Sequence, residues 1–117
     1  MAVRVLVCGG RNYKNFYLVD EVLSSLHSSN GIQCIIQGGA KGADFLAAVW
    51  AEAEDIYCKE YMAQWKELGP SAGSIRNQQM LDEGKPDLVV AFPGGKGTAD
   101  MVRRAENAGV KVIKVED

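Results

Sequence analysis

Glycines gather in three short segments of this sequence, and each segment directly follows an apolar run. Glycine lets the backbone adopt positive φ values and lets a ligand approach the chain closely. Where such a loop leads into a helix, the free N–H groups of the first turn and the helix dipole favour a bound anion. We therefore interpret the loops as candidate phosphate-binding turns. They read Gly9-Gly10-Arg11-Asn12, Gln37-Gly38-Gly39-Ala40-Lys41-Gly42-Ala43-Asp44 and Pro93-Gly94-Gly95-Lys96-Gly97-Thr98.

Polar side chains within these loops favour a ligand, although each loop alone could simply form a tight turn between a strand and a helix. Lys41 and Lys96 are candidates for phosphate contacts, but exposed loop lysines often serve only solubility. Arg11 and Asn12 follow the first apolar strand. Thr98 can cap the helix that follows it and bind a phosphate with the same hydroxyl.

Five further side chains extend the candidate site. Arg76 can pair bidentately with a phosphate or stabilise a departing base, or it can be a solvated surface arginine. Asp44 can bind ribose hydroxyls, and Asp100 raises the same possibility, but an acid in a first helical turn also stabilises its helix. Trp65 can stack on a base, with a core position as the alternative. Asn77 follows Arg76 directly.

Two widespread nucleotide signatures do not fit these loops. In the third loop Lys96 precedes Gly97, and Thr98 has no lysine before it, so the Gly-Lys-Ser/Thr ending of a P-loop is missing. After the first strand, Gly9-Gly10-Arg11 stands where a dinucleotide-binding strand would carry GxGxxG. A Walker-type ATPase and an ordinary NAD-dependent dehydrogenase are therefore not supported.

Short β-branched runs alternate with amphipathic segments, which is typical of βαβ units around a parallel sheet. The runs predict strands at 3–8, 32–36, 56–61, 88–92 and 110–115. Right-handed crossovers then give a Rossmann-like three-layer α/β sandwich with strand order 3-2-1-4-5. Because ligands of open α/β sheets bind where the winding reverses, the three loops should meet outside the carboxyl ends of strands 1, 2 and 4.

The helices that must cover this sheet are also indicated by the spacing of apolar residues. A third helix is predicted over 74–83 with Ser74 as its N-cap, and a fourth from near Thr98 to Gly109. Residues 62–73 read as a long irregular connection, which in a compact domain tends to be functional. The faces of the first two helices are formed by Leu18, Val19, Val22, Leu23 and Leu26, and by Phe45, Leu46, Val49, Trp50 and Ala53.

Size and composition limit the function classes. The 117 residues fit one domain, 1–117, and a formal net charge of -2 offers no broad positive field for a nucleic-acid backbone. The three cysteines lack metal-ligand spacing and read as buried free thiols, and the single histidine, His27, reads as structural. We expect no metal and no separate cofactor. The N-terminal apolar run is too short for a signal peptide or a membrane span, which predicts a cytoplasmic protein without a membrane partner.

Three of these motifs, in this order, resemble the SLOG superfamily, and the likeness spans nearly the whole chain. They are the second and third glycine loops and the segment Ala72-Gly73-Ser74-Ile75-Arg76-Asn77. That superfamily includes the LOG phosphoribohydrolases, also called lysine decarboxylase-like proteins, and the DNA-processing Smf/DprA proteins. The sequence is most similar to its small YspA/YpsA-related branch, which is common in bacteria and their phages. The resemblance implies a nucleotide-type ligand whose phosphate lies at the third loop and its helix.

The resemblance supports the hydrolase activity less well than it supports a nucleotide ligand, because one catalytic position does not match. In LOG enzymes an arginine before strand 4 and a glutamate three residues after the threonine assist cleavage of an N-glycosidic bond. Arg76 stands on the matching helix, but the glutamate position is Met101, and its neighbour Asp100 could replace it only if the helix start were rotated. LOG-like proteins generally form dimers, which implies a homodimer with Val102 or Trp50 at its interface.

Three functions follow from this reading, and the first is favoured. The chain could be a binding or sensor module for a nucleotide or nucleotide derivative. It could instead be a nucleoside 5′-monophosphate phosphoribohydrolase, with Arg76 and Asp100 as catalytic residues. It could also be an accessory protein that binds single-stranded DNA, a partner that we do not favour.

Overall fold

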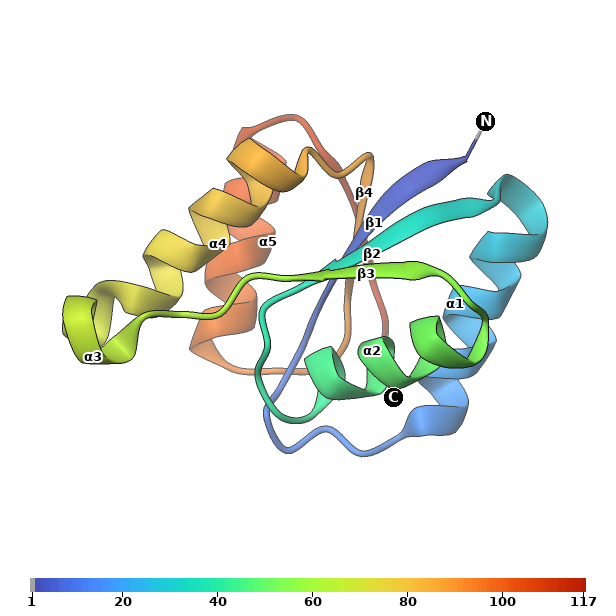
Figure 1. The fold of residues 1–117 in the computed structure, drawn as a ribbon, viewed down its shortest axis with the longest axis horizontal. Coiled ribbons are helices and arrows are strands. Elements are labelled where there is room, and N and C mark those ends of the chain that lie inside the picture. Colours follow the sequence, from blue (N-terminus) through green and yellow to red (C-terminus); the bar gives the residue numbers. More distant parts are fainter. Residues whose placement is uncertain (1) are drawn as a thin grey trace.

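A computed structural model describes residues 2–117. Its centre is a five-stranded parallel sheet with the strand order β3-β2-β1-β4-β5 (Figure 1). This is the order predicted from the alternation of apolar runs. The predicted strands agree with the observed ones to within one residue at either end. The observed strands are β1 (Val3–Cys8), β2 (Ile32–Gln37), β3 (Tyr57–Glu60), β4 (Leu88–Ala91) and β5 (Lys111–Lys114).

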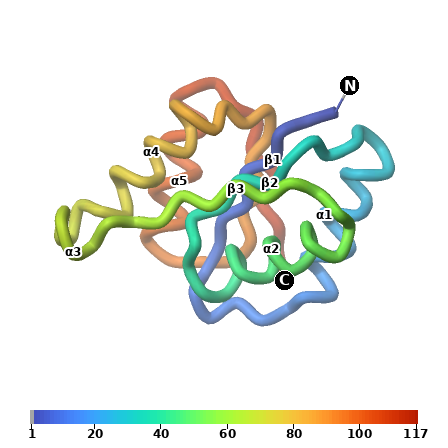
Figure 2. Tube along the Cα trace, viewed as in Figure 1, coloured from blue at the N-terminus to red at the C-terminus, as the bar shows by residue number. Residues whose placement is uncertain are grey.

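Helices cover both faces of the sheet, which makes the fold a Rossmann-like three-layer sandwich (Figures 1 and 2). One face carries α1 (Phe16–Asn30) and α2 (Ala43–Ala53), and the other carries α4 (Ala72–Gly84) and α5 (Lys96–Asn107). The alternation of side chains along β1 shows why both faces need cover. Val5 and Val7 belong to the core under α1 and α2, whereas Leu6 and Cys8 belong to the core under α4 and α5.

The face predicted for the second helix is only partly right. Trp50 is in the core with 1% of its surface exposed, but Phe45 and Val49 are 61% and 36% exposed. Ala43 and Ala47 take the inward positions instead, because the amide of Ala43 is hydrogen-bonded to the loop after β1 and sets the rotation of α2. Small residues there let the helix lie close to the sheet. Burial of Trp50 also excludes it from an interface between two copies of the chain, whereas Val102 is half-buried against the core under α5.

The segment 62–73 is not the irregular connection that was predicted. It contains a short helix, α3 (Trp65–Leu68), and a 3₁₀ turn, η1 (Gly69–Ser71), that runs directly into α4. Ser74 is therefore inside α4 and not its N-cap. Proline suits the first turn of a helical segment because its missing N–H would have no partner there, which explains why the turn begins at Gly69-Pro70.

The fourth predicted helix also begins earlier than expected. Gly95 is the N-cap of α5 and the helix starts at Lys96, so Thr98 is in the first turn and its hydroxyl does not cap the helix. Glycine is accepted at an N-cap position, although it provides no side-chain acceptor for the first amides. Those amides consequently remain available to other partners.

The expectations for histidine and cysteine hold in their main points. His27 accepts a hydrogen bond from the amide of Ile32 at 2.9 Å and packs edge-on against Trp50, which is a structural role. All three cysteines are free, with Cys8 and Cys34 buried and Cys58 half-buried. Within residues 2–117, none of the helices has the length and apolar character needed to cross a membrane.

Candidate functional site

The three glycine loops meet at the backbone of Gly10. Its N–H donates to the carbonyl of Pro93 at 2.8 Å, and its carbonyl accepts from the amide of Ala43 at 3.1 Å. Gly42, with φ of 76°, lies so close that a Cβ atom would collide with the Gly10 carbonyl. The predicted convergence of the loops at the carboxyl ends of β1, β2 and β4 is therefore confirmed, and glycine is required for this close packing.

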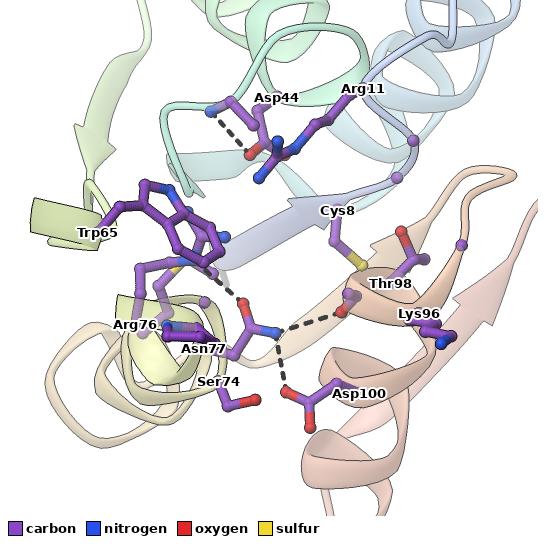
Figure 3. Close-up of a pocket in the computed structure, with 18 residues that line it drawn as sticks. Cys8, Arg11, Asp44, Trp65, Ser74, Arg76, Asn77, Lys96, Thr98 and Asp100 are labelled. Carbon is purple, nitrogen blue, oxygen red and sulfur yellow. Dashed lines mark hydrogen bonds between the residues drawn. The ribbon is translucent and has the colours of Figure 1, made fainter. Parts of the chain in front are cut away.

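A cavity of about 530 Å³ opens where the loops meet, between them and helix α4 (Figure 3). Most of the side chains and turns singled out in the sequence lie around it. A second cavity, of about 420 Å³, is lined by the remaining part of the second loop. Predicted residues around the first cavity are Gly9, Gly10, Arg11, Ala40, Asp44, Trp65, Arg76, Asn77, Gly95, Lys96, Gly97, Thr98 and Asp100.

Seven predicted site residues have other positions. Asn12, Gly38, Gly39 and Lys41 line the second cavity and not the first. Pro93 and Gly94, like Gly42, line neither of these cavities and serve the packing of the loops. A Cβ atom on Gly94 would lie 2.7 Å from the Gly10 amide nitrogen and would also overlap the Thr98 side chain.

The loop amides differ in whether they are free to bind a ligand. In the second loop the amide of Gly39 donates to Oε1 of Gln37 at 2.6 Å, and that of Ala40 donates to Oδ2 of Asp44 at 3.2 Å. The first-turn amides of α5 have no acceptor among residues 2–117. The helix end that follows the third loop is thus the part of the glycine motif whose N–H groups can hold an anion.

Asp44 and Arg76 flank Gly38 at the back of the site. The Nη1 atom of Arg76 donates to the Gly38 carbonyl, and a Cβ atom on Gly38 would lie 3.0 Å from Oδ2 of Asp44. Burial raises the pKa of Asp44 to about 6, against the opposing effects of the Ala40 amide and of Arg76. Burial also lowers the pKa of Arg76, which Asp44 partly offsets. Arg76 therefore presents its guanidinium to the cavity beside a carboxyl group whose ionisation is disfavoured by burial.

Asp100 is held by a network of donors on α4 and α5. Nδ2 of Asn77 donates to its Oδ2 at 3.0 Å and to the Gly97 carbonyl at 3.2 Å. Arg104 and Arg103 reach its two oxygens at 2.9 and 2.7 Å. Burial acts to raise the pKa of Asp100, but the hydrogen bonds from Asn77 and Arg104 outweigh it, and the pKa is below its usual value. Asp100 is thus an ionised carboxylate at the cavity wall.

Arg11 and Trp65 contact each other across the mouth of the site. The guanidinium carbon of Arg11 lies 5.5 Å from the centre of the Trp65 ring, within the range of a cation–π contact. Trp65 is 47% exposed and belongs to α3, so it is not a core residue. The core alternative for Trp65 is therefore wrong, and its stacking on a base stays a prediction.

Sequence reasoning did not identify five residues that line the first cavity: Cys8, Pro70, Gly73, Ser74 and Met80. Three of them lie on α4, and a helical face formed by Gly73, Asn77 and Met80 is visible in the sequence as spacings of four and three. Cys8 is the last residue of β1. It therefore lies at the carboxyl end of the strand, which is where open α/β sheets bind their ligands. Burial raises the pKa of its thiol to about 12, so Cys8 contributes an uncharged surface.

These features define a Rossmann-like α/β protein whose candidate site lies outside the carboxyl ends of the strands, at the reversal of winding between β1 and β4. The profile of the YspA, cpYpsA-related SLOG family (YAcAr) matches residues 3–67. The chain belongs to this family. The matched segment includes the first two glycine loops and Trp65, whereas Arg76 and the third loop follow it.

Two individual proteins are similar to the chain. It is 36% identical to the Gene 61 protein of Mycobacterium phage D29 over a 122-position alignment that covers 97% of each protein. In fold it is similar to DNA processing protein A (DprA) from Streptococcus pneumoniae, with a TM-score of 0.54 and 17% identity. That match covers 96% of this chain but 58% of the DprA chain. The second likeness therefore concerns the fold.

Proposed function

We propose that this protein is a binding or sensor module for a nucleotide or nucleotide derivative, and that the ligand occupies the 530 Å³ cavity with a phosphate at the first turn of α5. One observation carries the proposal. The same cavity exposes the unpartnered first-turn amides of α5 and the guanidinium of Arg76. Helix N-terminal amides and a guanidinium are both strong donors to phosphate oxygens.

The other cavity residues suit the rest of a nucleotide. Lys96 and Arg11 add positive charge at the rim. Asp44 has an acceptor oxygen for ribose hydroxyls, and Met80 and Trp65 provide apolar and aromatic surface for a base. Membership of a SLOG family supports a nucleotide-related role.

Isothermal titration calorimetry tests the proposal directly. A panel should pair each nucleoside 5′-monophosphate with its nucleoside, and include orthophosphate, cyclic nucleotides, ADP-ribose and a single-stranded oligonucleotide. We expect at least one monophosphate to bind, and its nucleoside to bind at least about tenfold more weakly, because the charge-assisted hydrogen bonds are lost. Equal binding of nucleoside and nucleotide would exclude the phosphate site. Binding of the oligonucleotide alone would favour a DNA-processing role.

Arg76 offers the sharpest variant. Arg76→Gln removes the charge and shortens the side chain, and we expect a loss of about 1.5–3 kcal/mol in binding, or about 10- to 150-fold. Lys111→Gln is the control, since Lys111 is an exposed cation on β5 that lines neither cavity. Equal losses in both variants would mean that Arg76 acts only through general charge.

A second candidate function is cleavage of an N-glycosidic bond, and the position of Asp100 favours it. Met101, at the position where LOG enzymes carry glutamate, is fully buried in the core, whereas Asp100 lines the cavity as an ionised carboxylate. A carboxylate there can stabilise an oxocarbenium-like transition state. Because Arg103 and Arg104 occupy its oxygens, Asp100 is better suited to this electrostatic role than to proton transfer.

Chromatography of reaction mixtures separates the two functions. If the protein is a phosphoribohydrolase, free base should accumulate from a nucleoside 5′-monophosphate, and Asp100→Asn should abolish its release. Orthophosphate should inhibit the reaction by competing for the first turn of α5. Tight binding of a monophosphate with no release of base over prolonged incubation would leave binding as the function.

A further inference from the structure

A second hollow adjoins the candidate site, and most of its lining takes no part in the phosphate contacts proposed above. This 420 Å³ cavity is lined by the second glycine loop and by Met62 and Ala63 before α3. Arg11, Ala40, Trp65 and Arg76 line both cavities. The two spaces are therefore neighbours that share a wall.

The exposed part of this wall is the contact between Arg11 and Trp65. The two side chains come from separate elements, the loop after β1 and the helix α3, and their cation–π contact joins these elements. Both residues are exposed, and a cation–π contact at an exposed site is weak. A ligand that provides another partner for the ring and for the guanidinium can separate them.

The charge of the second cavity indicates what it would accept. Its lining contains three cations, Arg11, Lys41 and Arg76, and no carboxylate. Glu60 is not part of this lining, although its Cδ would lie 3.1 Å from a Cβ atom on Gly39, and its Oε1 accepts a hydrogen bond from Gln37 at 3.3 Å. Such a lining attracts an anion rather than a neutral base or sugar.

We infer that the two cavities hold one ligand, a nucleotide with a second phosphoryl group beyond the ribose, and that this ligand opens the Arg11–Trp65 contact. The inference rests on the proposed function, since the first phosphate is placed at α5. The second phosphoryl group lies near Lys41, Arg11 turns from the tryptophan ring towards it, and the ring stacks on the base. The shared chemistry is found in nucleoside 3′,5′-bisphosphates and in 5′-phosphorylated dinucleotides.

Affinities for a matched series of ligands test this inference. With the base that binds best as a monophosphate, the series comprises the 5′-monophosphate, the 5′-diphosphate, the 3′,5′-bisphosphate and the 5′-phosphorylated dinucleotide. We expect the bisphosphate or the dinucleotide to bind about tenfold more tightly than the monophosphate, because one additional charged group is held. The diphosphate, whose phosphates are adjacent, should lack this advantage. The stronger of the two extended ligands identifies the chemical source.

Two lysines provide the matched variants. Lys41 lines the second cavity, whereas Lys96 lines the first. In Lys41→Gln the ratio of the monophosphate Kd to that of the extended ligand should fall from about ten to near one. In Lys96→Gln the ratio should stay near ten. Equal ratios in the two variants would overturn the assignment of the second cavity.

Tryptophan fluorescence reports the opening of the wall. The chain has two tryptophans, and Trp50 is buried, so iodide quenching of the native protein reports mainly Trp65. The extended ligand should reduce quenching, and Trp65→Phe should remove the signal change. If monophosphates bind but extended ligands gain less than threefold, the inference fails while the proposed function stands. If no member of the series binds, the proposed function fails and the inference fails with it.

Discussion

Asn77 on α4 and Asp100 on α5 are joined by a hydrogen bond of 3.0 Å between Nδ2 and Oδ2. The same amide nitrogen donates to the Gly97 carbonyl, and Oδ1 of Asn77 accepts from Nε of Arg76 at 3.2 Å. Asn77 itself is buried, with 5% of its surface exposed. One side chain thus fixes the first turn of α5, where we place a phosphate, relative to the arginine that would bind it.

Removing the Asn77 amide should weaken both folding and binding. We expect Asn77→Ala to lower the free energy of unfolding by about 1–3 kcal/mol, because buried partners lose their hydrogen bonds. Chemical denaturation measures this change. Gln79→Ala, at an exposed position on the same helix, should change stability by less than about 0.5 kcal/mol. A similar loss in both variants would indicate a general effect on α4.

The third loop contains a matched pair of glycines. An alanine at Gly94 would collide with the Gly10 backbone and the Thr98 side chain, whereas a Cβ atom on Gly95 meets nothing within 4 Å. We expect Gly94→Ala to cost about 1–3 kcal/mol of stability, as overpacking does, and to impair nucleotide binding. Gly95→Ala should fold nearly as well as the parent protein. Thermal melting would contradict this prediction if the two variants lost stability equally.

Asp44 should make stability depend on pH in a defined direction. Its pKa rises from an ordinary 3.8 to about 6 on folding, so the folded state holds the proton more tightly than the unfolded chain does. The resulting stability is fully present below pH 4 and is lost as the pH rises through 6. Asp44→Asn should therefore gain stability relative to the parent between pH 4 and 7, on the order of 2–3 kcal/mol.

Denaturant unfolding of both proteins at several pH values measures this difference. Asp82→Asn, on the exposed side of α4, controls for the loss of one carboxyl group. Parallel stability curves for the parent and Asp44→Asn from pH 4 to 7 would show that the carboxylate at position 44 is not destabilised by folding.

The cysteines should differ in reactivity. Cys8 and Cys34 are buried and Cys58 is half-buried, and burial raises the pKa of all three thiols. Since the thiolate is the reactive form, alkylation of the native protein at pH 8 should be slow and should begin at Cys58. Peptide mass spectrometry identifies the modified residue. Early modification of Cys8 would mean that solvent reaches the end of β1 through the cavity.

The sheet and the meeting of the loops could be predicted because both follow from local patterns. Runs of β-branched residues mark strands, and parallel strands bring their carboxyl ends to one edge. The salt bridges of Asp100 were not predicted, although Arg103 and Arg104 follow it at helical spacing.

Other features depend on contacts between distant parts of the chain and left no local signal. The rotation of α2, which exposes Phe45, is set by a hydrogen bond to the loop after β1. The four residues of α3 are too few to show a period, so the contact of Trp65 with Arg11 could not be foreseen. The hydrogen bonds of the Gly39 and Ala40 amides likewise depend on the orientation of the Gln37 and Asp44 side chains, which accept them.

The three loops are joined through the main-chain N–H and carbonyl of Gly10, a residue without a side chain. The geometry of this junction is consequently insensitive to which side chains surround it, provided that Gly10 and Gly42 are kept. Substitutions at Arg11, Lys41 or Lys96 can then alter what is recognised while the architecture stays the same. Such a framework lends itself to directed changes of specificity, and a library restricted to these three exposed positions should yield folded proteins at high frequency.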